Sequence, residues 1–131
     1  MLTKLFIDYL NRQVLSSDDM VVFEACKALC ELKDISNKEL GGAISSLTVF
    51  LMSSSSVNKF AALKILNKFI SNPSRASLLS NTNEVENLIS DNNRSLSCMA
   101  ISLLLKVCKE AQVEKLLNQI FEVLLNYEAY H

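Results

Sequence analysis

Seven stretches of the chain carry apolar residues at intervals of three and four positions, the spacing of one buried helix face. They predict helices at about 2–14, 18–32, 38–52, 57–70, 84–89, 94–107 and 112–127. The stretches 18–32 and 94–107 are apolar around most of the helix, so each is expected to lie between neighbours. Only two glycines and one proline are present, which argues against a many-stranded β-fold. The predicted fold class is therefore all-α.

Polar residues between these stretches carry the usual signals for helix starts and ends. The segment 16–19 (SSDD) can accept hydrogen bonds from the first free amides of a helix. Ser36 and Glu39 have the Ser-x-x-Glu spacing of a capping box. The four serines at 53–56 predict a solvated loop with an N-cap, and a phosphorylation site is the alternative. Pro73 ends the helix 57–70, because the residue before a proline is disfavoured in the α conformation.

Two places leave the pattern ambiguous. Gly41 and Gly42 fall inside the predicted helix 38–52, where each glycine costs about 1 kcal/mol relative to alanine. Either this helix starts late, or a neighbouring backbone approaches closely at the glycines. The polar segment 74–83 supports at most one helical turn, at 76–79.

Three predicted helices share a small residue followed by large apolar residues at helical spacing. The small residues are Ala25, Ala62 and Ala100, which are 37 and 38 residues apart. A period near 40 with two helices per unit is typical of HEAT/armadillo solenoids, in which stacked hairpins bury one another. An ordinary helical bundle with a chance spacing is the alternative. The wide apolar face of helix 112–127 is expected to be covered by a further repeat; it includes Ile120, Phe121, Leu124 and Leu125.

Composition and charge exclude several functional classes. The chain has 131 residues, which suits one domain, and half of them are hydrophobic, which argues against disorder. The net charge is −1 and the basic residues form no stripe, so nucleic acid is not an expected partner. No apolar run approaches the length that spans a bilayer, and the first residues lack the apolar core of a secretory signal. The dispersed lysines, Lys64, Lys68 and Lys106 among them, are interpreted as solvated.

Catalytic and metal-binding patterns are missing from the sequence. It contains no P-loop, dinucleotide fingerprint, nucleophile elbow or zinc-protease motif, and helix capping explains the acidic pair Asp18 and Asp19. The four cysteines are interpreted as small, reduced core residues of a cytosolic protein; they are Cys26, Cys30, Cys98 and Cys108. A metal site at Cys26 and Cys30 would need two more ligands, and the only histidine is His131. We therefore expect no enzyme activity, catalytic residue, cofactor or metal; a helical enzyme or cofactor bundle is the alternative.

Three segments carry a resemblance to a known family. Met20–Ala25 (MVVFEA) looks like a Met-Val-Val/Ile-Tyr-Glu-Ala stretch in the trunk of coatomer γ subunits. Phe60–Lys68 (FAALKILNK) is similar to that family's Tyr-Ala-Ala-Val-Arg-Thr-Leu-Asn-Lys. Glu86–Ser95 (ENLISDNNRS) resembles its Glu-Asn-Leu-Val/Ile-Thr-Asp-Ser-Asn-Arg-Ser. The chain departs from the family at 53–58, which lacks the usual proline, and at 72–74. These departures lie in loops, so the resemblance carries over the fold and not the loop contacts.

This resemblance implies that residues 1–131 form one α-solenoid segment of a longer adaptin-like trunk, without the appendage domain. It implies a scaffold role in a vesicle coat that acts in Golgi-to-ER retrograde and intra-Golgi transport, at the cytosolic face of Golgi membranes and coated vesicles. The implied partners are the ζ subunit and other coatomer subunits, with an Arf-type GTPase and cargo tails engaged through the full-length protein. The resemblance assigns no GTPase-contact residue to this segment. The alternative is a generic HEAT/armadillo interaction module, such as another adaptor large subunit, a transport receptor or a phosphatase scaffold.

The turn at Asp91, Asn93 and Arg94 is the best candidate for a special role. In the structural interpretation, Asp91 or Asn93 caps the helix 94–107 and Arg94 pairs across a repeat. In the functional interpretation, the same residues contact a partner subunit.

Overall fold

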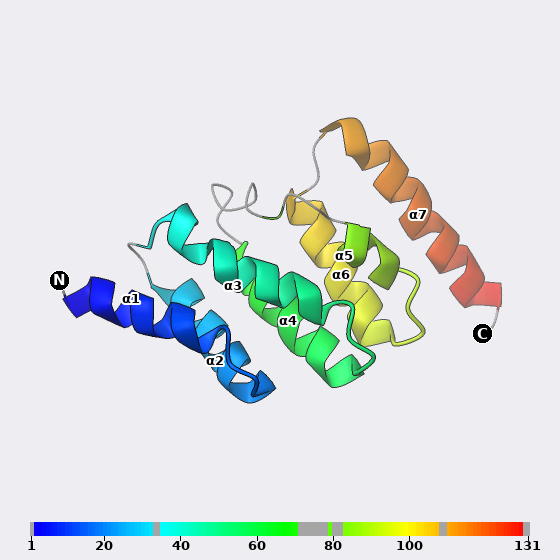
Figure 1. The fold of residues 1–131 in the computed structure, drawn as a ribbon. Helices are drawn as coiled ribbons and strands as arrows, with labels where there is room; N and C mark the ends of the chain where they lie inside the picture. The colour runs from blue at the N-terminus through cyan, green and yellow to red at the C-terminus, as the bar shows by residue number, and fades with distance from the viewer. Residues whose placement is uncertain (1, 33–34, 71–78, 80–82, 108–109, 130–131) are drawn as a thin grey trace.

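Helices are the only regular elements in the part of the chain that the structure, a computed structural model, describes. That part comprises residues 2–32, 35–70, 79, 83–107 and 110–129. Figure 1 shows an elongated row that begins with α1 and ends with α7. The helices are α1 (Leu2–Gln13), α2 (Asp19–Glu31), α3 (Asn37–Phe50), α4 (Ser56–Phe69), α5 (Asn83–Leu88), α6 (Arg94–Val107) and α7 (Glu110–Ala129). The predicted segments match these helices to within about two residues at each end.

The predicted caps explain most of these boundaries. Asp18 caps α2, with its Oδ1 accepting a hydrogen bond from the Met20 amide at 2.9 Å. Ser36 and Glu39 form the reciprocal capping box at the start of α3. Ser55 caps α4 by accepting from the Asn58 amide at 3.3 Å, so the interpretation of the serine stretch as a loop with an N-cap is confirmed. These side chains satisfy backbone amides that have no partner inside the helix.

Both explanations for the glycine pair were wrong. The helix α3 starts at Asn37, before the glycines, and neither glycine has a positive φ. A Cβ atom at Gly41 would meet nothing within 4 Å, and one at Gly42 would meet only the Asn11 side chain at 3.8 Å. No neighbouring backbone therefore requires glycine at either position. The turn suggested at 76–79 lies outside the described residues, except for the buried Leu79.

The helices form hairpins that stack in a row, as the repeat predicts. The two helices of each hairpin pack against each other; the hairpins are α1/α2, α3/α4 and α5/α6. The second helices of the hairpins, α2, α4 and α6, lie side by side (Figure 1). Ala25, Ala62 and Ala100 are 4 %, 0 % and 0 % exposed, so the three repeat alanines lie where neighbouring helices meet. Small residues let the helix axes approach closely at these points. The solenoid prediction is therefore confirmed.

The helices at the two ends of the row expose apolar side chains. On α1 these are Leu5, Phe6 and Tyr9. On α7, Leu116 is buried whereas Leu117, Phe121, Leu124 and Leu125 are exposed, with Phe121 at 63 %. None of the described helices combines the length and the apolar character that crossing a membrane would need.

One cysteine was assigned wrongly to the core. Cys26 is fully buried and Cys30 half-buried, but Cys98 is exposed. A helix turns by about 100° per residue, so Cys98 lies roughly 200° from the buried Ala100. An apolar run on a helix does not bury every member of the run. Cys108 lies outside the described residues.

Candidate protein-interaction surfaces

A groove of about 690 Å³ lies between α2 and α4, and we refer to it as the α2/α4 groove. Its lining spans Met20–Glu31 on α2 and Ala61–Phe69 on α4. The apolar side chains that line it are buried or half-buried, apart from the exposed Met20; the others are Phe23, Cys30, Ala61, Ile65 and Phe69. The charged side chains that line it are all exposed and therefore form its rim; they are Glu24, Lys27, Glu31, Lys64 and Lys68. An apolar floor with a polar rim is the usual build of a protein-binding surface.

The repeat sets the arrangement of charges along this rim. Ala25 and Ala62 are 37 residues apart, and the same interval separates Lys27 from Lys64. Equivalent positions of adjacent repeats lie beside each other in a solenoid, so the two lysines occupy matching places on the two sides of the groove. This surface was not predicted, because each lysine gives no signal in the sequence when it is considered alone. The shared interval was the available signal.

Two of the charged side chains on the rim, Glu31 and Lys68, form an ion pair with each other. The Nζ atom of Lys68 lies 3.5 Å from Oε1 of Glu31, and both side chains are largely exposed. An exposed pair of this kind contributes little stability, because water screens it and two long side chains lose freedom. Within the described residues, Glu24, Lys27 and Lys64 take part in no ion pair.

The floor of the groove is packed against the core from behind. The Phe23 ring from α2 packs against the Phe50 ring of α3, with ring centroids 4.4 Å apart. Phe69 and Phe23 are both buried in the common core. Side chains packed in this way lose little further freedom when a partner binds, which lowers the entropy cost of binding.

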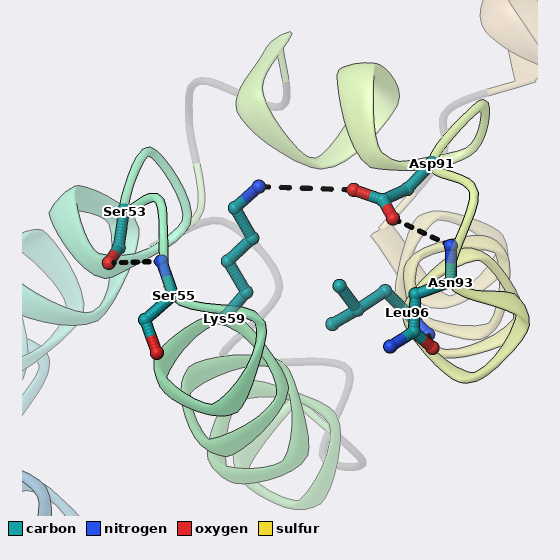
Figure 2. A network of polar contacts seen from close by, with 6 residues as sticks. All are labelled: Ser53, Ser55, Lys59, Asp91, Asn93 and Leu96. Carbon is teal, nitrogen blue, oxygen red and sulfur yellow. Dashed lines mark hydrogen bonds and ion pairs between the residues drawn. The ribbon is translucent and has the colours of Figure 1, made fainter.

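The turn before α6 places the three residues that the sequence singled out. Asn93 is the N-cap: its Oδ1 accepts from the amides of Ser95 at 3.0 Å and Leu96 at 3.4 Å. Oδ1 of Asp91 accepts from the Asn93 amide at 2.8 Å, which holds the turn, as Figure 2 shows. Arg94 is the first residue of α6 and is exposed.

Asp91 also forms an ion pair with the preceding hairpin. Its Oδ2 lies 3.8 Å from Nζ of Lys59 on α4, and a dashed line marks this pair in Figure 2. The two side chains are 20 % and 23 % exposed, so this pair is better shielded from water than the pair at the groove rim. Between α2 and α4, the Asn58 side-chain amide donates to Asp19 Oδ2 at 3.3 Å. These contacts join successive hairpins along one edge of the row.

The described residues form no metal cluster, and the buried Cys26 thiol has a structural environment. No three His, Cys, Asp or Glu side chains of the described residues lie close enough together to hold a metal ion. Burial, helped by the nearby Cys30, raises the pKa of the Cys26 thiol to about 12. That thiol points at the Ala43 carbonyl, with Sγ 3.7 Å from the oxygen. A thiol that stays protonated is a poor nucleophile and a poor metal ligand.

Comparison with known proteins agrees with the solenoid. A family described as the adaptin N terminal region matches residues 2–130. The coatomer subunit gamma of Dictyostelium discoideum is 39 % identical over 117 residues, which cover 89 % of this chain and 13 % of that protein. The gamma-2 subunit of Oryza sativa subsp. japonica is 40 % identical over 116 residues, 88 % of this chain and 13 % of the relative.

Human coatomer subunit gamma-1 is 35 % identical over 113 residues, again 13 % of the relative's length. No solved structure matches the chain. The chain therefore spans a small part of the relatives that it resembles. The family match, however, covers nearly all of its own residues and agrees with the stacked hairpins. This chain belongs to the adaptin N-terminal region family, and it is similar to a segment of coatomer γ subunits.

Proposed function

We propose that the chain is a scaffold segment of a coatomer-type vesicle coat. The observation that carries this proposal is the sequence similarity to coatomer gamma subunits. The identity is 35–39 % in alignments that cover 86–89 % of the chain. The fold supports it, because stacked hairpins present a long surface for protein contacts. The role needs no bond chemistry, so the proposed function is not enzymatic.

The proposal extends to the partners and the location implied by the family. The chain acts as one segment of a longer trunk, and neighbouring hairpins cover the apolar faces of α1 and α7. Through that trunk it joins other coatomer subunits, the ζ subunit in particular, and works with an Arf-type GTPase and cargo tails. It acts at the cytosolic face of Golgi membranes and vesicles, in retrograde and intra-Golgi transport. Phe121 and its apolar neighbours on α7 are exposed, and this supports the proposal that a further hairpin covers that face.

Arg94 is the residue proposed to reach a partner subunit from the turn Asp91–Arg94. Asp91 and Asn93 hold the turn by hydrogen bonds, whereas Arg94 is exposed beside them. In this proposal Asp91 and Asn93 fix the position of the arginine. Arginine suits this role, because its planar guanidinium binds carboxylates through two hydrogen bonds.

The test is affinity purification of the protein from the cells that encode it, followed by mass spectrometry. Coatomer subunits should co-purify with the tagged protein, and an Arg94→Glu variant should retain less of one of these subunits while its circular dichroism spectrum shows that it remains folded. An exposed Lys38→Glu change serves as the charge control. Co-purification of another adaptor complex, a transport cargo or a phosphatase without coatomer would overturn the assignment. Unchanged binding by Arg94→Glu would overturn only the role of the turn.

A further inference from the structure

The α2/α4 groove has features that packing within the chain does not use. It has a volume of about 690 Å³. Its lining on α2 runs from Met20 to Glu31, a length of about 16 Å at the rise of an α-helix. The apolar floor is therefore long enough for about three helical turns of a guest.

The backbone around the groove favours a helical guest over an extended one. Both walls are α-helices, whose interior amides and carbonyls are already paired with each other. An extended peptide would find few backbone partners here and would leave its own polar groups unpaired. A helix satisfies its own backbone and needs only side-chain contacts, as in other helix-in-groove complexes.

The charges on the rim define the polarity of the guest. Glu31 and Lys68 neutralise each other, which leaves Glu24, Lys27 and Lys64 without an ion pair among the described residues. Lys27 and Lys64 hold matching places on opposite walls, so their like charges disfavour each other. A carboxylate placed between them would relieve that repulsion. Glu24, about one turn earlier on α2, favours a neutral or basic group at that end of the guest.

We propose that the α2/α4 groove binds an amphipathic helix of a partner protein, with apolar side chains on the floor and a carboxylate between Lys27 and Lys64. This inference does not depend on the coat assignment, because it rests on the shape and charge of the groove alone. The apolar side chains supply most of the affinity, and the carboxylate sets the register and the choice of partner.

Binding is measured by fluorescence polarisation with synthetic 18-residue helical peptides and the whole chain. The first peptide carries leucines at i, i+3, i+4 and i+7 with flanking glutamates. The second carries lysines in place of the glutamates, and the third has the first composition in scrambled order. The glutamate peptide should bind more tightly than the other two.

The groove variant is Lys27→Glu with Lys64→Glu. It should weaken binding of the glutamate peptide by about tenfold or more and strengthen binding of the lysine peptide. The matched control is Lys4→Glu with Lys115→Glu, which makes the same change in net charge at exposed sites outside the groove. The control should leave both affinities within about twofold. Since all four lysines are exposed, the melting temperatures should stay close to that of the parent.

The methionines report where the peptide binds. Met20 lines the groove, whereas Met52 and Met99 do not. In methyl NMR spectra of methionine-labelled protein, the glutamate peptide should shift the Met20 signal and leave those of Met52 and Met99 in place. Equal binding of all three peptides, an equal loss in the control variant, or an unmoved Met20 signal would overturn the proposal. Preferential binding to anionic lipid vesicles over the glutamate peptide would overturn it as well, in favour of a lipid surface.

Discussion

The ammonium group of Lys106 on α6 donates to two oxygens of Asn67 on α4, the backbone oxygen at 3.0 Å and Oδ1 at 3.3 Å. The Asn67 amide in turn donates to the carbonyls of Leu63 at 3.3 Å and Met99 at 3.0 Å. Asn67 is 7 % exposed, so this polar side chain lies in the core between two repeats with its hydrogen bonds satisfied. A buried polar group of this kind fixes how α4 and α6 sit against each other.

Replacement of Asn67 should therefore destabilise the protein. Asn67→Ala removes bonds to two helices and leaves the Lys106 ammonium with fewer partners, at a cost of about 1–3 kcal/mol. Urea denaturation followed by circular dichroism measures the loss. The control is a double-mutant cycle with Lys106→Met, which should show a coupling of about 0.5–3 kcal/mol. Strictly additive effects would contradict a direct interaction between the two side chains.

The contact between Lys106 and Asn67 is also an example of a feature that could not be predicted from the sequence. Helix periodicity and caps depend on residues three or four apart, and these predicted all seven described helices. Lys106 is exposed, as the sequence analysis expected, but its contact with Asn67 was not predicted, because that partner lies 39 residues away on a different helix. Such a pair depends on how the repeats stack, and no local pattern encodes it.

The candidate surfaces also combine local features, which the sequence predicts, with contacts between repeats, which it does not. Asp91 and Asn93 stand in a turn that the sequence marks by itself, and their hydrogen bonds are local. The ion pair of Asp91 with Lys59 and the facing positions of Lys27 and Lys64 appear only when hairpins are placed side by side. A solenoid is more predictable than most folds in this respect, because an interval of 37 or 38 residues maps one repeat onto the next.

A long charged side chain should not be tolerated at the repeat alanine of α6. Ala100 is fully buried, so Ala100→Arg forces a guanidinium into a close helix contact and should cost about 3 kcal/mol or more. Ser102 lies on the exposed side of the same helix, and Ser102→Arg is the matched control. Thermal melts should show a large loss for the first variant and little change for the second. A parent-like melt for Ala100→Arg would show that α6 is placed wrongly.

The glycine at position 41 should be replaceable with a gain in stability. Gly41→Ala adds a methyl group at a place where no other atom lies within 4 Å. The φ angle of Gly41 is not positive, so the backbone there also suits alanine. Alanine reduces the entropy of the unfolded chain, so the free energy of unfolding should rise by about 0.5–1 kcal/mol. Denaturant unfolding measures the change. Gly42→Ala provides a second test, since its new methyl group would meet only ordinary contact with the Asn11 side chain. A loss of stability at Gly41 would reveal a contact that the structure does not show.

The cysteines should differ in their rates of alkylation. Cys98 is exposed and should react readily with iodoacetamide, whereas Cys26 is buried with a pKa raised to about 12 and should react only after unfolding. Mass spectrometry of the digested protein after timed labelling measures the rate at each site. Labelling in urea is the control, because it should make the two rates similar. Comparable rates in the native state would contradict the packing of α2 against α3.

The capping box of α3 should make stability depend on acidic pH. Hydrogen bonds from the side chain and the backbone of Ser36 lower the pKa of Glu39 below its ordinary value of 4.5. A lowered folded-state pKa contributes stability that is fully present above the ordinary value and is lost as the pH falls through the folded-state pKa. Glu39→Ala should therefore be less stable than the parent at neutral pH, and the difference should shrink in acid. Glu39→Gln keeps an acceptor without a titrating proton, so its stability relative to Glu39→Ala should not change with pH. If the parent and Glu39→Ala kept the same separation from neutral pH to well below 4.5, the carboxylate form of Glu39 would have no part in the cap.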